Sequence, residues 1–134
     1  MTLRRFMPLA LALALSGCGA QQDSADFEGE KKAVADVVEE LQTAAKARQA
    51  EDICADVFSR GLTESFKAPG NDCVREIDKA VRDADDTELE VRAVTITGST
   101  AQARVEGRIG SGTGLKVLGL TREGSAWRVS DLGG

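Results

Sequence analysis

The chain has 134 residues and a formal net charge of −5, with 17 basic and 22 acidic residues. It contains neither histidine nor tyrosine, which excludes Ser-His-Asp and Cys-His catalysis, histidine-ligated zinc, and acid–base pairs that need a tyrosine donor. The acidic balance argues against nucleic-acid binding, because such binding draws its affinity from Lys and Arg side chains against phosphates.

The first 17 residues are arranged like an export signal. Arg4 and Arg5 form a basic start, an apolar run extends from Phe6 to Leu15, and the small residues Ser16-Gly17 precede Cys18. This is the three-part layout of a cleaved signal peptide. The apolar run is about ten residues long, whereas a helix that spans a bilayer needs about twenty. We therefore expect residues 1–17 to be a signal peptide and not a permanent membrane span.

The boundary Leu15-Ser16-Gly17-Cys18 resembles the lipobox of bacterial lipoproteins. The resemblance implies that Cys18 receives a diacylglyceryl group and becomes the mature N-terminus. Two or three acyl chains hold a protein stably on a membrane. The expected location is therefore the extracytoplasmic face of a cell membrane, with the lipid on Cys18 as anchor. The alternative is an ordinary secretory signal that happens to end beside a cysteine.

Beyond the signal, the sequence predicts a tether followed by one domain. Residues 18–27 are mostly small and polar and offer little to bury, so they read as a flexible tether. Residues 28–134 are expected to form a single domain. Removing residues 1–17 leaves 15 basic against 22 acidic residues, a net charge of about −7 for the mature chain.

Three helices are predicted in the first half of this domain. Between residues 29 and 50, apolar residues recur at three- and four-residue steps, which indicates one buried stripe on a helix. A second, shorter stripe extends from Ile53 to Leu62, with Gly61 as the expected stop. A third follows the break at Pro69-Gly70, with Asn71 or Asp72 as its cap.

Two cysteines remain in the mature chain once Cys18 carries lipid, and they lie on the apolar faces of neighbouring predicted helices. Export places Cys54 and Cys73 in an oxidising compartment, where two thiols usually pair. We therefore expect a Cys54–Cys73 disulfide; the alternative is two buried free thiols. With no histidine and only these two cysteines, neither a metal site nor a cofactor is expected.

After residue 86 the apolar period changes from helical to two, which is typical of strands. The first strand extends from Leu89 to Ile96, and a change of phase at Ala93 predicts a β-bulge. Residues 100–109 form the second strand, Gly110–Gly114 a turn, and residues 115–121 the third strand. A turn at Glu123-Gly124 leads to a last strand with Trp127. The predicted fold class is α+β, with three N-terminal helices packed on a four-stranded antiparallel curved sheet.

The order of these elements resembles the nuclear transport factor 2-like superfamily, in particular its small exported members from high-GC bacteria. The resemblance covers Glu30 to Leu132 and includes the segments Asp52-Ile53-Cys54 and Gly124-Ser125-Ala126-Trp127-Arg128-Val129. It implies a cone-shaped fold with a cavity at the open end. The hairpin that many members carry between their second and third helices has no counterpart here. Because the superfamily includes isomerases, dehydratases, cyclases and binding domains, function stays open.

Three residues are candidates for a ligand site. Asp131 follows Val129 by two residues, so a regular strand would point it to the face of Trp127, where a buried carboxylate could act as a base. The alternative is that Asp131 meets water or caps a turn. Glu64 could line the mouth of a cavity or be solvated at a helix end. Trp127 could stack on a ligand or anchor the last strand in the core.

The sequence therefore predicts a membrane-tethered binding domain without catalytic activity, which recognises another envelope protein or a small apolar ligand at the open end of its sheet. The alternative is a small cofactor-independent isomerase or cyclase that uses Asp131 or Glu64 as base beside Arg104 or Arg128. A homodimer through the exposed face of the sheet is also open, with Leu118 and Leu120 as the residues to inspect.

Overall fold

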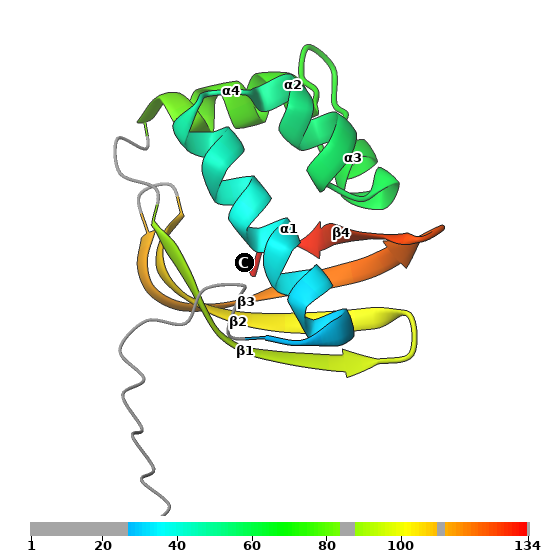
Figure 1. Cartoon of the computed structure of the whole chain (residues 1–134). Coiled ribbons are helices and arrows are strands. Elements are labelled where there is room, and N and C mark those ends of the chain that lie inside the picture. Colours follow the sequence, from blue (N-terminus) through cyan, green and yellow to red (C-terminus); the bar gives the residue numbers. More distant parts are fainter. Residues whose placement is uncertain (1–26, 84–87, 110–111, 134) are drawn as a thin grey trace, which may run out of the picture.

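The computed structural model describes residues 27–83, 88–109 and 112–133. The expected signal peptide, Cys18 and most of the tether lie outside the described residues, so these expectations stay predictions. In the described part of the chain, none of the helices has both the length and the apolarity needed to cross a membrane. The fold is α+β, as expected: helices come first, and a four-stranded antiparallel sheet follows (Figure 1).

The first helix, α1 (Gly29–Lys46), lies across one face of the curved sheet (Figure 1). Its predicted apolar stripe is the buried face, with Val34, Val38 and Leu41 in the core. The opposite face carries charged residues, and the Lys32 ammonium pairs with the Asp36 carboxylate one turn later at 2.9 Å. This division of apolar and charged side chains makes α1 amphipathic, and its apolar face packs on the sheet.

The second predicted helix is interrupted. The chain forms α2 (Ala50–Asp52), a π-helical turn η2 (Ile53–Val57), and then α3 (Arg60–Ser65) after an extended Phe58. The side chain of Ser59 caps α3 by accepting a hydrogen bond from the Leu62 N–H at 3.1 Å. The prediction that Gly61 ends this helix was wrong, because the Ser59 cap starts a new helix and places Gly61 in its first turn.

The interruption brings Phe58 beside the last strand. Phe58 forms an isolated parallel bridge with Val129, and the Ser59 N–H donates to the Val129 carbonyl at 2.8 Å. Both Phe58 and Ser59 are buried. The break between η2 and α3 therefore attaches the helical layer to one edge of the sheet.

The last helix, α4 (Cys73–Asp83), starts where the sequence predicts. Of the two candidate caps, Asp72 is the one used: its carboxylate accepts from the Arg75 N–H at 2.9 Å. Cys73, Ile77 and Val81 form the buried face, and α4 packs mainly on α2, η2 and α3. This helix thus forms an outer layer held chiefly by other helices.

The sheet has the strand order β1-β2-β3-β4, a meander with β1 and β4 at its edges. The strands are β1 (Leu89–Thr97), β2 (Thr100–Ile109), β3 (Gly112–Glu123) and β4 (Ala126–Asp131). The predicted bulge is confirmed: Val91 pairs with Val105 and Ala93 with Arg104, which leaves Arg92 as the extra residue of β1.

The predicted turn at Gly110–Gly114 is shorter than expected. Gly112 already belongs to β3, and Gly114 pairs with Gly107 of β2. Gly107 has φ +144°, and a Cβ built on it would lie 1.7 Å from the Glu88 carbonyl oxygen. Only glycine permits this approach of the chain entering β1, which explains the glycine at position 107.

Candidate functional site

Cys54 and Cys73 are joined by a disulfide bond. The Sγ atoms of Cys54, in η2, and Cys73, at the start of α4, lie 2.02 Å apart. Both residues are buried, so the bond links the π-helical turn to the outer helix from inside the helical layer. The structure therefore contains the Cys54–Cys73 disulfide that the sequence predicts.

Trp127 belongs to the core and not to an open ligand site. Its side chain is 5% exposed, and its Nε1–H donates to Oε2 of Glu30, at the start of α1, at 3.0 Å. The Arg122 guanidinium lies over the ring, 4.6 Å from its centroid, and also pairs with Glu30. Of the two interpretations of Trp127, the structure supports the core aromatic that anchors the last strand.

Asp131 does not share the face of Trp127 and Val129. Leu120 pairs with Val129, but Gly119 pairs with Asp131, so Ser130 is an extra residue that changes the phase of β4. Asp131 is exposed, and its carboxylate accepts from the Gly133 N–H at 2.8 Å. The interpretation as a buried base is wrong here, because the bulge turns the carboxylate outward to cap the end of the strand.

Glu64 lies at a pocket, although it is itself exposed. This pocket has a volume of about 390 Å³ and is formed by η2, the α3 segment and the β3–β4 hairpin; Arg128 also lines it. The Arg128 guanidinium donates to the carbonyl of Ala55 at 3.1 Å and to that of Asp56. The structure thus brings together Glu64 and Arg128, which the enzyme hypothesis names, but with the carboxylate in solvent.

Leu118 and Leu120, the leucines that the dimer hypothesis places at an interface, are buried. Leu118 is 0% and Leu120 1% exposed, and both belong to the core beneath the helices. Among the residues whose burial the structure describes, the large apolar side chains that face solvent are the alternating pair Leu115 and Val117, at 54% and 42% exposure. An apolar surface therefore exists on β3, but on the opposite face of the strand from the two leucines that the sequence singled out.

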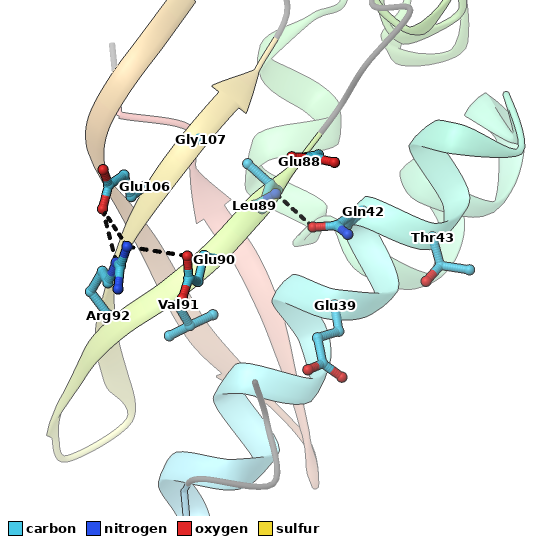
Figure 2. A pocket seen from close by; sticks show the side chains of 10 residues that line it. All are labelled: Glu39, Gln42, Thr43, Glu88, Leu89, Glu90, Val91, Arg92, Glu106 and Gly107. Carbon is cyan, nitrogen blue, oxygen red and sulfur yellow. Dashed lines mark hydrogen bonds and ion pairs between the residues drawn. The ribbon is translucent and has the colours of Figure 1, made fainter. Parts of the chain in front are cut away.

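A larger hollow, which the sequence did not predict, lies at the edge of β1. We call it the β1 cleft: an open cavity of about 560 Å³ between the second half of α1, the entry to β1, and β2. Gln42 of α1 fixes its inner wall, because its Oε1 accepts from the Leu89 N–H at 2.6 Å (Figure 2). Leu89 is half-buried and Val91 is buried, so the apolar part of the lining belongs to the core.

Carboxylates from three parts of the chain line this cleft. Glu39 comes from α1, Glu88 and Glu90 from the start of β1, and Glu106 from β2, with Arg92 as the guanidinium among the lining residues. Arg92 is the bulge residue; its Nη2 lies 2.8 Å from a carboxylate oxygen of Glu106 and 3.2 Å from one of Glu90 (Figure 2). The lining thus carries four acidic groups and one basic group, in a hollow that solvent reaches.

The sequence shows these acidic residues only as solvated positions on separate elements. Glu39 and Gln42 are about one helical turn apart on α1, and Glu88 directly precedes β1, which contains Glu90, but no local pattern predicts that these elements meet. The pairing of Glu90 with Glu106 across β1 and β2 is a matter of strand register. A polar residue in the half-buried stripe, Gln42, is the one signal that could have indicated a tertiary contact there.

The arrangement does not favour a metal ion. Among the residues that the structure describes, no group of three or more Cys, Asp or Glu side chains is placed to hold one. The carboxylates of the β1 cleft are spread around an open hollow, which suits a larger ligand better than a single ion. Comparisons with protein-family models, curated proteins and solved structures give no match to this chain.

Proposed function

We propose that this protein is an exported lipoprotein, anchored to the extracytoplasmic face of a membrane through Cys18, whose domain binds a positively charged group in the β1 cleft without catalysing a reaction. The anchor is supported by the sequence Leu15-Ser16-Gly17-Cys18 after a short apolar run. The Cys54–Cys73 bond agrees with an oxidising compartment. The observation that carries the binding function is the presence of four glutamates, from α1, β1 with its entry, and β2, around one cleft.

The charge of the cleft decides the class of ligand. Two unit charges 4 Å apart interact by about 1 kcal/mol in water and by more where solvent is partly excluded. Four carboxylates against one guanidinium therefore attract a cation and repel an anion. The mature chain, at about −7, adds a long-range field of the same sign. An ammonium or guanidinium group is the complementary chemistry.

The cation belongs to an envelope protein or to a small amine. A Lys or Arg side chain on a partner protein offers the charge at the end of an apolar stem, and such a stem can lie on the exposed part of Leu89. A small diamine offers the same group. A wholly apolar ligand has less support, because the lining is dominated by charged and amide side chains.

We also infer that the fold is a small member of the nuclear transport factor 2-like superfamily. The supporting features are helices before a four-stranded meander, and a long helix lying across a curved sheet (Figure 1). This assignment leaves the activity open, since the superfamily hosts both enzymes and binding domains.

The alternative, a cofactor-independent isomerase or cyclase, has one observation in its favour. Glu64 and Arg128 line the same cavity of about 390 Å³. A carboxylate base is tuned by burial in dry surroundings, whereas Glu64 is exposed. Turnover of a metabolite by the purified protein, abolished by Glu64→Gln, would establish the enzyme and overturn the non-catalytic function.

The anchor is tested by the mature N-terminus. We expect mass spectrometry to find a diacylated N-terminal residue 18, and cell fractionation to find the protein with membranes. Cys18→Ser should remove both the lipid and the membrane association while leaving export intact. An unmodified N-terminus, or processing at another bond in the unaltered protein, would overturn the lipoprotein proposal.

The cleft is tested with cadaverine, a diamine with an apolar stem, by titration calorimetry on the processed protein. Glu88→Gln should weaken binding about fivefold, which corresponds to about 1 kcal/mol, and added salt should weaken it further. Glu51→Gln is the matched control, because Glu51 is exposed on α2, outside the cleft. Equal affinity for cadaverine and neutral pentanol would show that charge does not select the ligand.

A homodimer through β3 remains a proposal alongside these. Leu115 and Val117 are exposed on the sheet face that α1 leaves uncovered. If two copies pair there, Val117→Lys should convert a dimer into a monomer in analytical ultracentrifugation. A monomer at all concentrations for the unaltered processed protein would exclude the pairing.

A further inference from the structure

The pocket beside Glu64 differs in charge from the rest of the molecule. Its lining contains the cations Arg60, Lys67 and Arg128, and the carboxylates Glu64 and Glu123. Basic groups therefore outnumber acidic ones here, in a chain whose overall charge is −5. This reversal is local, since the larger cleft at β1 has the opposite composition.

Two of the pocket's charged residues lie on one face of α3, because Arg60 and Glu64 are four residues apart on that helix. Lys67 follows the end of α3, where its N–H donates to the Glu64 carbonyl at 3.0 Å. Leu62 and Phe66 are half-buried and pack against the core instead. The α3 segment is therefore oriented by its apolar residues, and its charged side faces the pocket that Arg128 closes from β4.

Two of the charged groups in the pocket are already engaged. The Glu123 carboxylate accepts from the backbone N–H of Arg60 at 2.8 Å, and Nη1 of Arg128 donates to two carbonyls of η2. These bonds fix the β3–β4 hairpin against the helical layer. A guanidinium has five N–H donors. The bonds to η2 use Nη1 of Arg128, so the N–H groups on its Nε and Nη2 take no part in them.

The other cations are unpaired within the described residues. Neither the Arg60 guanidinium nor the Lys67 ammonium makes a hydrogen bond or an ion pair there, although Arg60 and Glu64 have the i,i+4 spacing. The same spacing does produce ion pairs elsewhere in this chain, at Lys32–Asp36 and Arg82–Asp78. Arg60 and Lys67 thus remain available to a ligand.

We propose that this pocket is a second binding site, selective for a small organic anion that carries a carboxylate. A planar guanidinium matches a carboxylate through two parallel hydrogen bonds, and an ammonium adds a point charge. Arg60 and Lys67 supply the charge, and Arg128 supplies a donor held in place by η2. A volume of about 390 Å³ accommodates a small molecule or the end of a peptide. Glu64 opposes the anion and sets its orientation.

The site is tested on the processed protein by titration calorimetry with succinate. We expect Arg60→Gln to weaken succinate binding about fivefold, equivalent to about 1 kcal/mol, and Arg60→Gln/Lys67→Gln to weaken it about 25-fold. Glu64→Gln should strengthen it about fivefold, because it removes the opposing charge. Lys79→Gln is the matched control, since Lys79 is exposed on α4, outside the pocket. All four variants change exposed side chains, so unfolding is not expected.

Further arms identify the source of the carboxylate and separate this site from the cleft. A dipeptide with a free carboxyl end should bind, and the same dipeptide as its amide should not. Glu88→Gln should leave succinate binding unchanged, and Arg60→Gln should leave cadaverine binding unchanged. The proposal is overturned if succinate shows no saturable binding at millimolar concentration, or if Lys79→Gln weakens binding as much as Arg60→Gln.

Discussion

Removal of the disulfide gives the sharpest test of how the helical layer is held. The bond closes a loop with a sequence separation of 19 residues. On the chain-entropy model, a loop of about 20 residues restricts the unfolded state by about 3 kcal/mol. Cys54→Ala/Cys73→Ala should therefore lower the free energy of unfolding by about 3 kcal/mol. For a domain of this size, that corresponds to a fall in Tm of about 12 to 24 °C.

The loss of stability should be greater in α4 than in the central strands. The Cys73 end of the bond is the first residue of α4, which packs mainly on α2, η2 and α3. Without the bond, α4 loses its covalent link to η2 and keeps only the contacts of Ile77, Val81 and their neighbours. Amide hydrogen exchange should therefore accelerate in α4 before it changes in β2 and β3, because local opening begins where packing is sparsest.

The measurement is urea unfolding followed by fluorescence of Trp127, the single tryptophan of the chain, with hydrogen exchange on the same samples. Trp127 is buried and lies against Glu30 and Arg122, so its fluorescence reports unfolding of the core. Two results would refute the reasoning: a loss smaller than about 1 kcal/mol, or a stability loss with α4 still as protected as the central strands.

Two further changes test the contacts at the ends of the sheet. Gly107→Ala should lower the free energy of unfolding in urea by at least about 2 kcal/mol, because φ at this position is +144° and the new Cβ would overlap the Glu88 carbonyl. Gly61→Ala, where the new Cβ meets open space on α3, should leave the free energy of unfolding unchanged or raise it by up to about 1 kcal/mol. Equal effects of the two would contradict the steric account. Glu30→Ala should cost about 1 to 3 kcal/mol, because it leaves the buried Trp127 N–H without its acceptor, and Glu30→Gln should restore part of the loss. Glu40→Ala is the control, because Glu40 is exposed on α1. A similar loss of stability in this variant would contradict the role given to the Glu30–Trp127 hydrogen bond.

The elements that the sequence predicts well are those with a strong local signal. The apolar stripe of α1, the Asp72 cap of α4 and the bulge near Ala93 each depend on spacing or on one side chain, and each is present. The pairing of Cys54 with Cys73 follows from compartment and helical phase, and it too is present. Local propensity and tertiary structure agree at these positions, so periodicity alone finds them.

The errors lie where tertiary contacts override local patterns. Gly61 looks like a helix end, but the extended Phe58 is held against Val129, and Ser59 can then cap a new helix. Asp131 seems to continue the face of Val129 until the bulge at Ser130 is known. Both outcomes depend on pairings between elements, Phe58 with Val129 and Gly119 with Asp131, which the apolar pattern of a single element does not show.

The β1 cleft was missed for the same reason. Its glutamates are exposed or half-buried residues on separate elements, and they line one cleft only because the second half of α1 lies beside the entry to β1 and because Glu90 lies opposite Glu106. Trp127, a candidate for ligand stacking, belongs to the core. Glu64, for which a cavity mouth and a solvated helix end were both open, is exposed and also lines a pocket. The sequence thus identifies single residues that could bind or react, but which of them lie together becomes visible only in the folded structure.

The bridge between Phe58 and Val129 has a consequence for self-association of the domain. An open strand edge offers unpaired N–H and C=O groups, and neighbouring copies can add to it and aggregate. Here Phe58 and Ser59 occupy part of the β4 edge, while a bulge and the charged group around Arg92 interrupt the β1 edge. Both margins of the sheet are thereby partly obstructed, which disfavours the addition of strands from other copies.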